Sequence, residues 1–269
     1  MPLEHALPDS LRVERRGDVA LLTLSRPHKR NALDDVTVLA IGRFFETPPS
    51  WARAVVLEPE GDHFSAGLDL SELGERDAVA GLHHSRMWHS AFERIESGPL
   101  PVVAVLRGAV VGGGLELACA AHVRVAERSA FYALPEGQRG LFVGGGASVR
   151  VPKLIGVHRM LDMMLTGRVL TAEEGERAGL SQYLADDGQG TAMALELAAR
   201  AAANSPITNY AVLQALPRIA AANPQEGFFL ESLMTAVAQS SAEAKERMRD
   251  FLEGRAAKVA ASGTEGGSR

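Results

Sequence analysis

A single carboxylate, Glu116, stands in an apolar segment that begins with three consecutive glycines, Gly112 to Gly114. Glycine leaves bare backbone that a ligand can approach, and it adopts positive φ without penalty. A helix that starts at these glycines would point unpaired N–H groups and the positive end of its dipole at the space beside them. The segment therefore predicts a place where an anion, or an oxygen that becomes one, is stabilised.

The nearest helical neighbours of Glu116 carry no positive charge: Gly112, Gly113, Cys119 and Ala120 occupy the i±3 and i±4 positions. Burial of such a carboxylate would raise its pKa and make it an acid or base that works near neutral pH. From this segment alone a second interpretation stays open, in which Glu116 faces water or meets a distant arginine.

A second carboxylate, Glu136, follows a predicted strand and precedes another glycine-rich stretch, Gly140 to Gly146. Two carboxylates in different surroundings commonly divide acid and base roles. The backbone around Leu68 and around Gly113 has little side-chain bulk beside it and could donate hydrogen bonds to a developing enolate. This set of residues predicts an enolate-stabilising site.

Composition narrows the class of protein. The 269 residues are 46% hydrophobic and 23% charged, which is ordinary for a soluble globular protein. A net charge of −5 offers no electrostatic footprint for nucleic acid or an anionic membrane. A lone cysteine excludes an internal disulfide, the first 18 residues lack the apolar core of a secretion signal, and the longest apolar run (101–117) contains Arg107. We expect a soluble, cytoplasmic protein without nucleic-acid or membrane partners.

Short apolar runs alternate with helical patterns, which indicates an α/β architecture. Strands are predicted at 11–13, 19–24, 54–57, 101–106, 123–126 and 130–134. A helix capped by Asp34 should end before Pro48. Helical patterns dominate from about residue 190 to Lys258, with helices separated at Pro206, Pro217 and Pro224.

The segment 71–96 has a helical pattern that Gly74 and Gly81 are expected to break. Its second half carries imidazole and indole groups at His83, His84, Trp88 and His89. His84 and His89 are five residues apart, a poor spacing for shared ligation on a helix, so no metal site is expected. A mobile, partly exposed helix over a pocket is the preferred interpretation.

Five motifs, in this order along the chain, resemble those of the enoyl-CoA hydratases in the crotonase superfamily. They are Arg26-Pro27-x-x-x-Asn31-Ala32-Leu33, Phe64 to Leu70, Gly112 to Ala118, Pro135-Glu136 followed by Gly140 and Gly144, and Leu165 to Arg168. The resemblance covers roughly residues 11 to 180. It implies a crotonase-type ββα superhelix over 1–190, a helical region for trimer formation over 191–259 and a flexible tail over 260–269.

The resemblance also implies the reaction, the reversible syn addition of water to the double bond of a 2-enoyl-CoA. Glu116 and Glu136 match the family's two catalytic glutamates. Glu116 would orient and deprotonate the water and Glu136 would protonate the α-carbon, although the two residues can share these tasks. The backbone N–H groups of Leu68 and Gly113 match the oxyanion hole that holds the thioester oxygen.

Contacts with substrate or coenzyme A are implied for Lys29, Arg30, Ala66, Asp69 and Leu70. For the basic loop at Lys29 and Arg30, an ordinary solvated surface is an equally good interpretation. Arg255 and Lys258 are weaker candidates for phosphate contacts, because Gly254 stands where the family often has lysine. The only coenzyme implied is the one in the acyl-CoA substrate, no metal is implied, and the implied assembly is a homotrimer or a dimer of trimers.

Two alternative functions stay open. One is an enoyl-CoA isomerase, in which Glu136 alone moves a proton between carbons. The other is a crotonase-like protein that binds acyl-CoA without turnover. The polar segment Gly137-Gln138-Arg139 replaces apolar residues that many hydratases have there, so the acyl group is not defined by the sequence.

Overall fold

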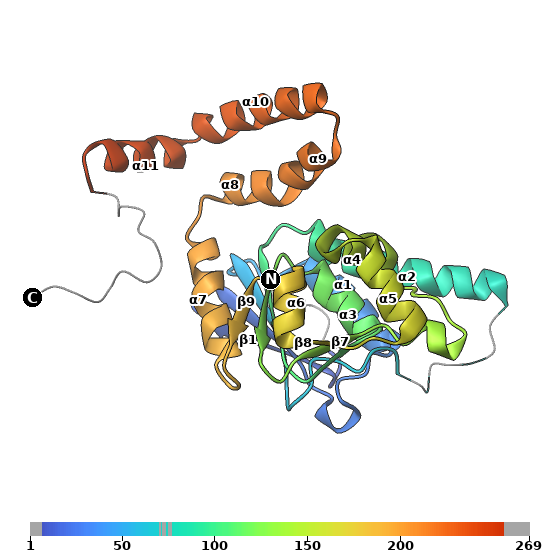
Figure 1. Ribbon diagram of the computed structural model, residues 1–269. Coiled ribbons are helices and arrows are strands. Elements are labelled where there is room, and N and C mark those ends of the chain that lie inside the picture. Colours follow the sequence, from blue (N-terminus) through green and yellow to red (C-terminus); the bar gives the residue numbers. More distant parts are fainter. Residues whose placement is uncertain (1–6, 70, 72–73, 75–76, 256–269) are drawn as a thin grey trace, which may run out of the picture. The chain divides into compact units, whose positions relative to one another are not determined.

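The computed structural model describes residues 7–69, 71, 74 and 77–255. These residues form two compact units, one that ends at Asn204 and one that begins at Ser205. The first unit combines helices with two sheets, and the second is helical (Figure 1). The predicted α/β architecture with a helical C-terminal region is therefore confirmed.

A six-stranded sheet forms the centre of the first unit. Its strands, in spatial order, are β1 (Leu11–Arg16), β2 (Val19–Leu24), β3 (Ala54–Pro59), β4 (Val102–Leu106), β6 (Val123–Glu127) and β9 (Tyr183–Ala185). β1 and β2 make an antiparallel hairpin, whose turn contains Gly17 at φ 62°. The other neighbours pair in parallel. All the strands predicted in this sheet are confirmed, and β1 is longer than expected.

Helices cover both faces of this sheet, which is why its parallel strands are almost continuously apolar. α7 (Gly190–Ala202) packs on β2, β3, β4 and β6 from one side. In β3, Val56 belongs to the core beneath α7, whereas Val55 and Leu57 belong to the larger core on the opposite face. Because α7 is part of this packing, the first unit continues to Asn204, past the boundary expected at residue 190.

A smaller sheet contains β5 (Ala109–Val111), β7 (Phe131–Ala133) and β8 (Leu170–Thr171). β5 leads directly into α3 (Gly113–Ala120), and β7 ends two residues before Pro135 and Glu136. Isolated bridges join Ser65 to Val110 and Leu33 to Leu68. The loop that carries Leu68 is thereby held against the strand that precedes α3.

Two helices pack on each other beside these elements. α1 (Asp35–Glu46) begins as predicted, because the Asp34 side chain accepts a hydrogen bond from the Thr37 amide. α2 (Ala78–Glu96) runs without interruption through Gly81, so the break predicted there is wrong. A glycine inside a helix costs about 1 kcal/mol, and burial of Trp88 and Phe92 on the same helix outweighs that cost.

The rest of the first unit consists of short helices. These are η1 (Pro27–Lys29), η3 (Gly137–Arg139), α4 (Ala147–Ile155), α5 (Val157–Thr166) and α6 (Ala172–Ala178). They connect the strands and, through η3 and α4, flank the glycine-rich stretch that follows Glu136.

The second unit contains α8 (Pro206–Tyr210), η4 (Ala211–Ala215), α9 (Leu216–Ala221), α10 (Pro224–Ser240) and α11 (Ala242–Leu252). Pro206 and Pro224 begin helices as expected. The separation expected at Pro217 is wrong, because helical structure continues from 206 to 221 through the π-helical segment η4. Proline lacks the N–H that a regular helical hydrogen bond needs. The wider π-helical turns of η4 end at Ala215, shortly before Pro217, so Pro217 lies in the first turn of α9. The tail over 260–269 lies outside the described residues.

No helix among the residues that the structure describes has both the length and the apolar composition needed to cross a membrane.

Phe44→Ala is expected to lower the free energy of unfolding by about 3 to 5 kcal/mol. The side chain is 1% exposed and packs edge to face against Phe45, with the ring centroids 5.1 Å apart. Urea unfolding followed by far-UV circular dichroism measures the change. Val36→Ala on the same helix is the control, because Val36 is 59% exposed and should change stability by no more than about 0.5 kcal/mol. Equal losses in the two variants would contradict the assignment of this core.

Candidate active site

A cavity of about 370 Å³ brings the two predicted glutamates together. Its walls come from the loop at Ala66 to Leu68, from α2, from the start of α3 and from the stretch between Pro135 and Gly145. Glu116 and Glu136 both line it, although β6 and β7 separate them in the chain.

Glu116 lies in the first turn of α3 and is 3% exposed. Its Oε1 accepts hydrogen bonds from the backbone amides of Gly145 at 2.7 Å and Ala147 at 3.0 Å. Burial raises the pKa of Glu116, and these hydrogen bonds only partly oppose the effect. Glu116 therefore does not face water: its carboxylate is buried and is oriented by two backbone amides.

The glycine-rich stretch after Glu136 supplies this support, a role that sequence reasoning missed. A Cβ on Gly145 would lie only 2.7 Å from Glu116 Oε2, so the amide can come this close only because residue 145 is glycine. Arg150 donates to the Gly145 carbonyl at 3.1 Å and ties the loop to α4. The signal in the sequence was the run Gly144-Gly145-Gly146, but nothing local linked it to Glu116.

Glu136 follows β7 and is half-buried. Its Oε2 is buried and has no hydrogen-bond partner within the described ranges. Burial raises the pKa of Glu136, the charge of Glu116 adds to that rise, and Arg139 opposes it. Gly112, at φ 53°, leaves room for this side chain, because a Cβ there would lie 2.6 Å from Glu136 Oε1. The cavity therefore holds two carboxyl groups that both favour the protonated form more than ordinary glutamates do.

The two predicted backbone donors also lie side by side. The Leu68 nitrogen is 3.4 Å from the point where a Cβ on Gly113 would stand, and the Gly113 nitrogen is 3.1 Å from the corresponding point on Gly67. Gly113 is the first residue of α3, so its N–H has no acceptor within the helix. Gly67, at φ 91°, turns the loop so that Leu68 follows next to the helix start. Both residues line the cavity, and the pair can bind one oxygen.

α2 forms one wall of the cavity through His84, Ser85 and Trp88, in agreement with the pocket interpretation. Asp35 on α1 holds two of these side chains: its Oδ1 accepts from His84 Nε2 at 2.8 Å and from Trp88 Nε1 at 3.3 Å. Across the described part of the chain, no three histidine, cysteine, aspartate or glutamate side chains converge in a way that could hold a metal ion.

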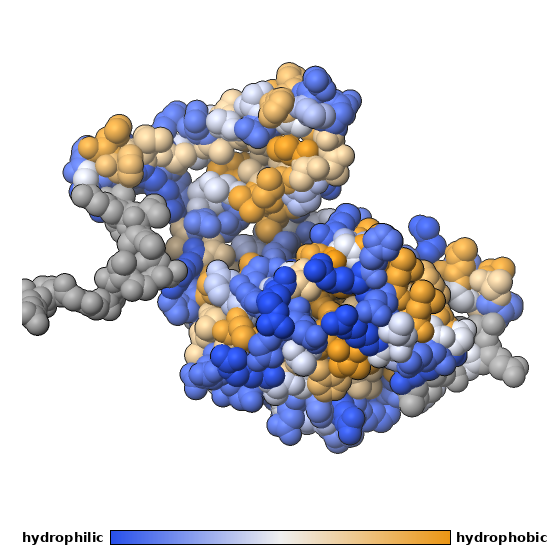
Figure 2. Space-filling model, viewed as in Figure 1, coloured by the Kyte–Doolittle hydropathy of each residue, from blue (hydrophilic) through white to orange (hydrophobic). Residues whose placement is uncertain are grey.

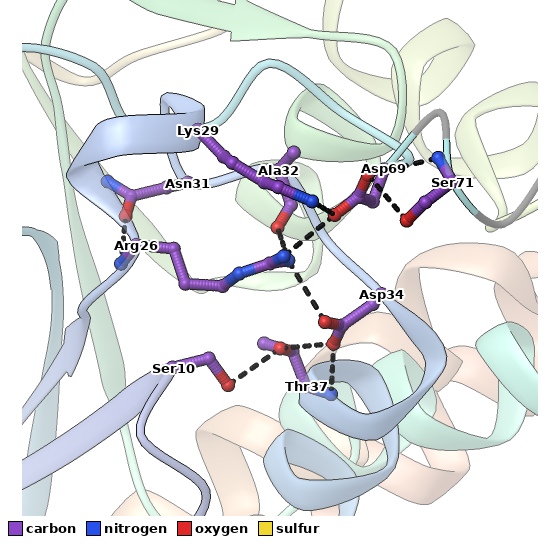
Figure 3. Close-up of polar contacts among 9 residues, drawn as sticks. All are labelled: Ser10, Arg26, Lys29, Asn31, Ala32, Asp34, Thr37, Asp69 and Ser71. Carbon is purple, nitrogen blue, oxygen red and sulfur yellow. Dashed lines mark hydrogen bonds and ion pairs between the residues drawn. The ribbon is translucent and has the colours of Figure 1, made fainter.

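Two of the residues expected to contact coenzyme A bind each other (Figure 3). Lys29 Nζ donates to Asp69 Oδ2 at 3.0 Å, and Arg26 donates to the same oxygen at 2.7 Å. Asp69 is 5% exposed, and the bond from Lys29 in particular, aided by those from Ser71, holds the pKa of this carboxyl well below its usual range. Arg26 also pairs with Asp34 at 3.0 Å, so the network joins the basic loop to the start of α1.

The other residues expected to contact coenzyme A lie in different surroundings. Ala66 lines the cavity and donates its amide hydrogen to the Arg30 carbonyl at 2.9 Å. The Arg30 side chain is exposed, and its φ of 52° lies in the left-handed region. Arg255, in the second unit, is paired with Asp250 and Glu253. Leu70 and Lys258 lie outside the described residues.

Two carboxyl groups of raised pKa that share a cavity with two adjacent backbone amides suit an acid–base enzyme acting on an activated carbonyl compound. The chain belongs to the enoyl-CoA hydratase/isomerase family, whose sequence profile matches residues 14–260. This membership and the structural relatives below confirm the predicted place in the crotonase superfamily and its type of fold.

Among curated proteins, the chain is similar to the enoyl-CoA hydratase EchA19 of Mycobacterium tuberculosis, with 32% identity over 93% of this chain and 95% of the relative. It is 30% identical to the 2,3-dehydroadipyl-CoA hydratase of Escherichia coli, over 90% of this chain and 95% of that protein. These names support an enoyl-CoA hydratase.

Among solved structures, a protein from Rhodopseudomonas palustris, provisionally assigned as an enoyl-CoA hydratase, superposes with a TM-score of 0.89. It is 60% identical, and the match covers 91% of this chain and 95% of that one. The enoyl-CoA hydratase of Bacillus anthracis superposes with a TM-score of 0.86 at 27% identity, over 91% of this chain and 97% of that one.

Glu116→Gln is expected to change the free energy of unfolding in a pH-dependent way. Relative to wild type, the variant should be more stable at neutral pH than at acidic pH. A carboxyl whose folded pKa is raised stabilises the fold below its unfolded pKa, near 4.5 for glutamate, and this contribution is lost as pH rises through the folded value. Glutamine does not ionise, so the variant should gain stability relative to wild type as pH rises above 4.5. Urea unfolding of both proteins at a series of pH values from 4.5 upward measures the difference, and a variant that becomes less stable relative to wild type as pH rises would contradict the raised pKa.

Asp69→Asn should show the opposite sign. The folded pKa of Asp69 is lowered, so its contribution is present above the unfolded pKa and is lost as the solution becomes acidic. The substitution is expected to cost about 2 kcal/mol at neutral pH, where charged hydrogen bonds are lost. The cost should begin to fall below pH 3.8, the ordinary aspartate value, and should be clearly smaller at about pH 2, because the folded pKa is lower still. Urea unfolding at about pH 7 and at about pH 2 measures the change. Equal costs at the two pH values would contradict the prediction.

Proposed function

We propose that this protein hydrates 2-enoyl-CoA thioesters, adding water reversibly across the 2,3 double bond with syn stereochemistry. One observation supports this proposal above all: Glu116 and Glu136, both with a raised pKa, line the same cavity. Leu68 and Gly113, whose amides are the expected donors, line it too. Curated relatives named as hydratases of enoyl-CoA and 2,3-dehydroadipyl-CoA support the same reaction class.

In this mechanism the thioester oxygen accepts hydrogen bonds from Leu68 and Gly113. Glu116 Oε1 is occupied by two backbone amides, so Oε2 takes the proton from water as the water oxygen bonds to C3. The electron pair of the double bond then moves toward the thioester, and its oxygen becomes an enolate oxygen. Each amide donor is worth about 3 kcal/mol at such an oxyanion.

Protonation of C2 completes the addition. Glu136, whose pKa burial raises, donates this proton and is left as a carboxylate. A proton must then pass from Glu116 to Glu136 before the next turnover. The reaction consumes only water and the thioester, so we propose that it needs neither a metal nor a cofactor beyond the coenzyme A of the substrate.

The alternatives receive less support from the site. An isomerase that used Glu136 alone would not require Glu116 to be oriented by Gly145 and Ala147. A protein that only bound acyl-CoA would not need two carboxyl groups of raised pKa, because burying them opposes folding at neutral pH.

For coenzyme A we propose contacts with Lys29, Arg30 and Ala66, and also with Leu70, which lies outside the described residues. The Lys29 side chain remains 43% exposed beside Asp69, so its ammonium group can also meet a phosphate. Asp69 would act indirectly, by holding Lys29 and Arg26 in place.

We further propose that the second unit contributes to a homotrimer or a dimer of trimers. Large apolar side chains are exposed on its helices, including Phe228 at 71%, Phe229 at 64% and Leu252 at 75%. Figure 2 shows hydrophobic surface, in orange, on the helices of this unit. Exposed apolar surface of this kind marks protein–protein contacts. Sedimentation equilibrium of the full chain tests the assembly, and a monomer at micromolar concentration would contradict it.

A hydration assay tests the proposed reaction. Purified protein is mixed with a short 2-enoyl-CoA, and loss of the absorbance of the conjugated thioester is followed in buffer that contains a chelator. Glu116→Gln and Glu136→Gln should each lower kcat about 10²- to 10⁴-fold, the usual contribution of a general acid or base. Glu176→Gln is the control, because this glutamate is exposed on α6 and does not line the cavity.

The other functions predict different results. Near wild-type hydration by Glu116→Gln would contradict its role in activating water. Conversion of a 3-enoyl-CoA without hydration of the 2-enoyl-CoA would favour the isomerase. Binding of acyl-CoA without either turnover would favour the binding protein.

A further inference from the structure

Trp88 lines the cavity, but the proposed mechanism gives it no role. Its side chain comes from the middle of α2, is 3% exposed and lines the same cavity as Glu116 and Glu136. Its Cζ3 atom is 2.8 Å from the point where a Cβ on Gly113 would stand, so the indole lies directly against the residue whose amide binds the thioester oxygen.

The indole also lies beside the carboxylate that activates water. Both groups lie close to the position that a Cβ on Gly145 would occupy. Trp88 Cε3 is 3.1 Å from that position, and Glu116 Oε2 is 2.7 Å from it. In the proposed reaction Glu116 delivers water to C3 of the acyl chain. The carbons that follow C3 must therefore begin their path next to the indole.

The indole is fixed in this position from several sides. Its Nε1–H donates to Asp35 Oδ1 at 3.3 Å, and the Phe92 ring packs against it nearly edge to face with centroids 5.5 Å apart. Gly113 lies closer to the ring than a residue with a Cβ could, and Gly145 leaves only 3.1 Å between its Cβ position and the ring. A buried group packed in this way moves only at the cost of its neighbours.

Two other apolar groups of the cavity wall are much less confined. Leu141 is 48% exposed and Phe142 is 71% exposed, so these side chains can turn toward solvent without loss of buried contacts. Val143 also lines the cavity and is buried, at 8% exposed. The indole is the larger of these two buried side chains.

We propose that Trp88 is the end wall of the acyl site and restricts the enzyme to short 2-enoyl-CoA substrates, with Asp35 as the residue that positions it. The proposal rests on the hydratase function proposed above. A chain that continues far beyond C3 meets the indole, whereas a short chain ends in contact with it. A smaller side chain at position 88 opens space in which additional methylene groups are buried.

The experiment compares 2-enoyl-CoA substrates of four, six, eight and ten acyl carbons. In the wild type, kcat/KM should fall as the chain lengthens beyond six carbons. In Trp88→Leu and Trp88→Ala, the ratio of kcat/KM for the ten-carbon to the four-carbon substrate should rise at least tenfold. Each methylene that gains a buried place can add up to about a fourfold increase.

Ile95→Ala is the matched control. Ile95 is another apolar residue of α2, is fully buried and does not line the cavity, so its substitution weakens the packing of the helix without changing the wall. The chain-length profile of this variant should follow the wild type. Asp35→Ala, which releases the indole but leaves it in place, should shift the profile in the same direction as Trp88→Leu by a smaller factor.

A binding measurement keeps the proposal testable apart from catalysis. Calorimetric titration with butyryl-CoA and decanoyl-CoA, which cannot be hydrated, should show a wild-type preference for butyryl-CoA that Trp88→Leu reverses. Trp88→Phe, a milder change, replaces Trp88→Leu if the latter does not fold, and it should shift both profiles partway.

The outcomes separate the two proposals. A wild type that hydrates and binds ten-carbon and four-carbon thioesters equally well would overturn the end wall and leave the hydratase intact. A folded Trp88→Leu variant with an unchanged profile would also overturn it, as would an equal shift in Ile95→Ala. A wild type that binds butyryl-CoA in preference to decanoyl-CoA but hydrates no enoyl-CoA would contradict the hydratase and support the wall.

Discussion

The close approach of two backbone segments is the constraint on which the rest of the site depends. The start of α3 packs directly on the loop at residues 65–68, and a Cβ on Gly114 would stand 2.5 Å from the Ser65 carbonyl oxygen. A Cβ on Gly67 would stand 2.7 Å from the Val111 carbonyl oxygen. Side chains at these positions would force the segments apart and separate the amides of Leu68 and Gly113. The bridge between Ser65 and Val110 holds the same contact from the side of the smaller sheet.

The carboxylates of the first unit divide into two kinds according to their surroundings. Asp69 is buried among cations and hydrogen-bond donors, which stabilise its charge and use it to join loops. Glu116 and Glu136 are held in the cavity without a direct ion pair in the described structure, and their charged forms are disfavoured. A group that keeps its charge suits a structural network, and a group that exchanges a proton suits catalysis.

The cavity also shows how one helix serves two purposes. α2 contributes Phe92 and Ile95 to the main core, and one turn earlier it presents Trp88 to the cavity. The packing that stabilises the helix therefore also fixes the wall of the site. Loss of the contacts that Phe92 and Asp35 make with Trp88 would therefore change the position of the wall.

Much of the fold could be predicted because its signals are local. The apolar runs at 19–24 and 54–57 became buried strands, and Asp34 caps its helix because a cap requires only a side chain and an amide three residues apart. Two of the differences from expectation occurred where packing outweighed local preference. Gly81 does not break α2, and the sheet draws α7 into the first unit beyond residue 190.

The site divides in the same way. The sequence by itself determined which groups are present: two glutamates, the glycines that leave their backbone accessible, and the ordered motifs that resemble one enzyme family. Tertiary structure alone decided that Glu116 is buried and oriented by amides 29 and 31 residues further along the chain. It alone brought Asp35 to Trp88 across 53 residues. Local spacing encodes hydrogen bonds within a turn, whereas contacts between distant segments exist only once the sheet and its helices have packed.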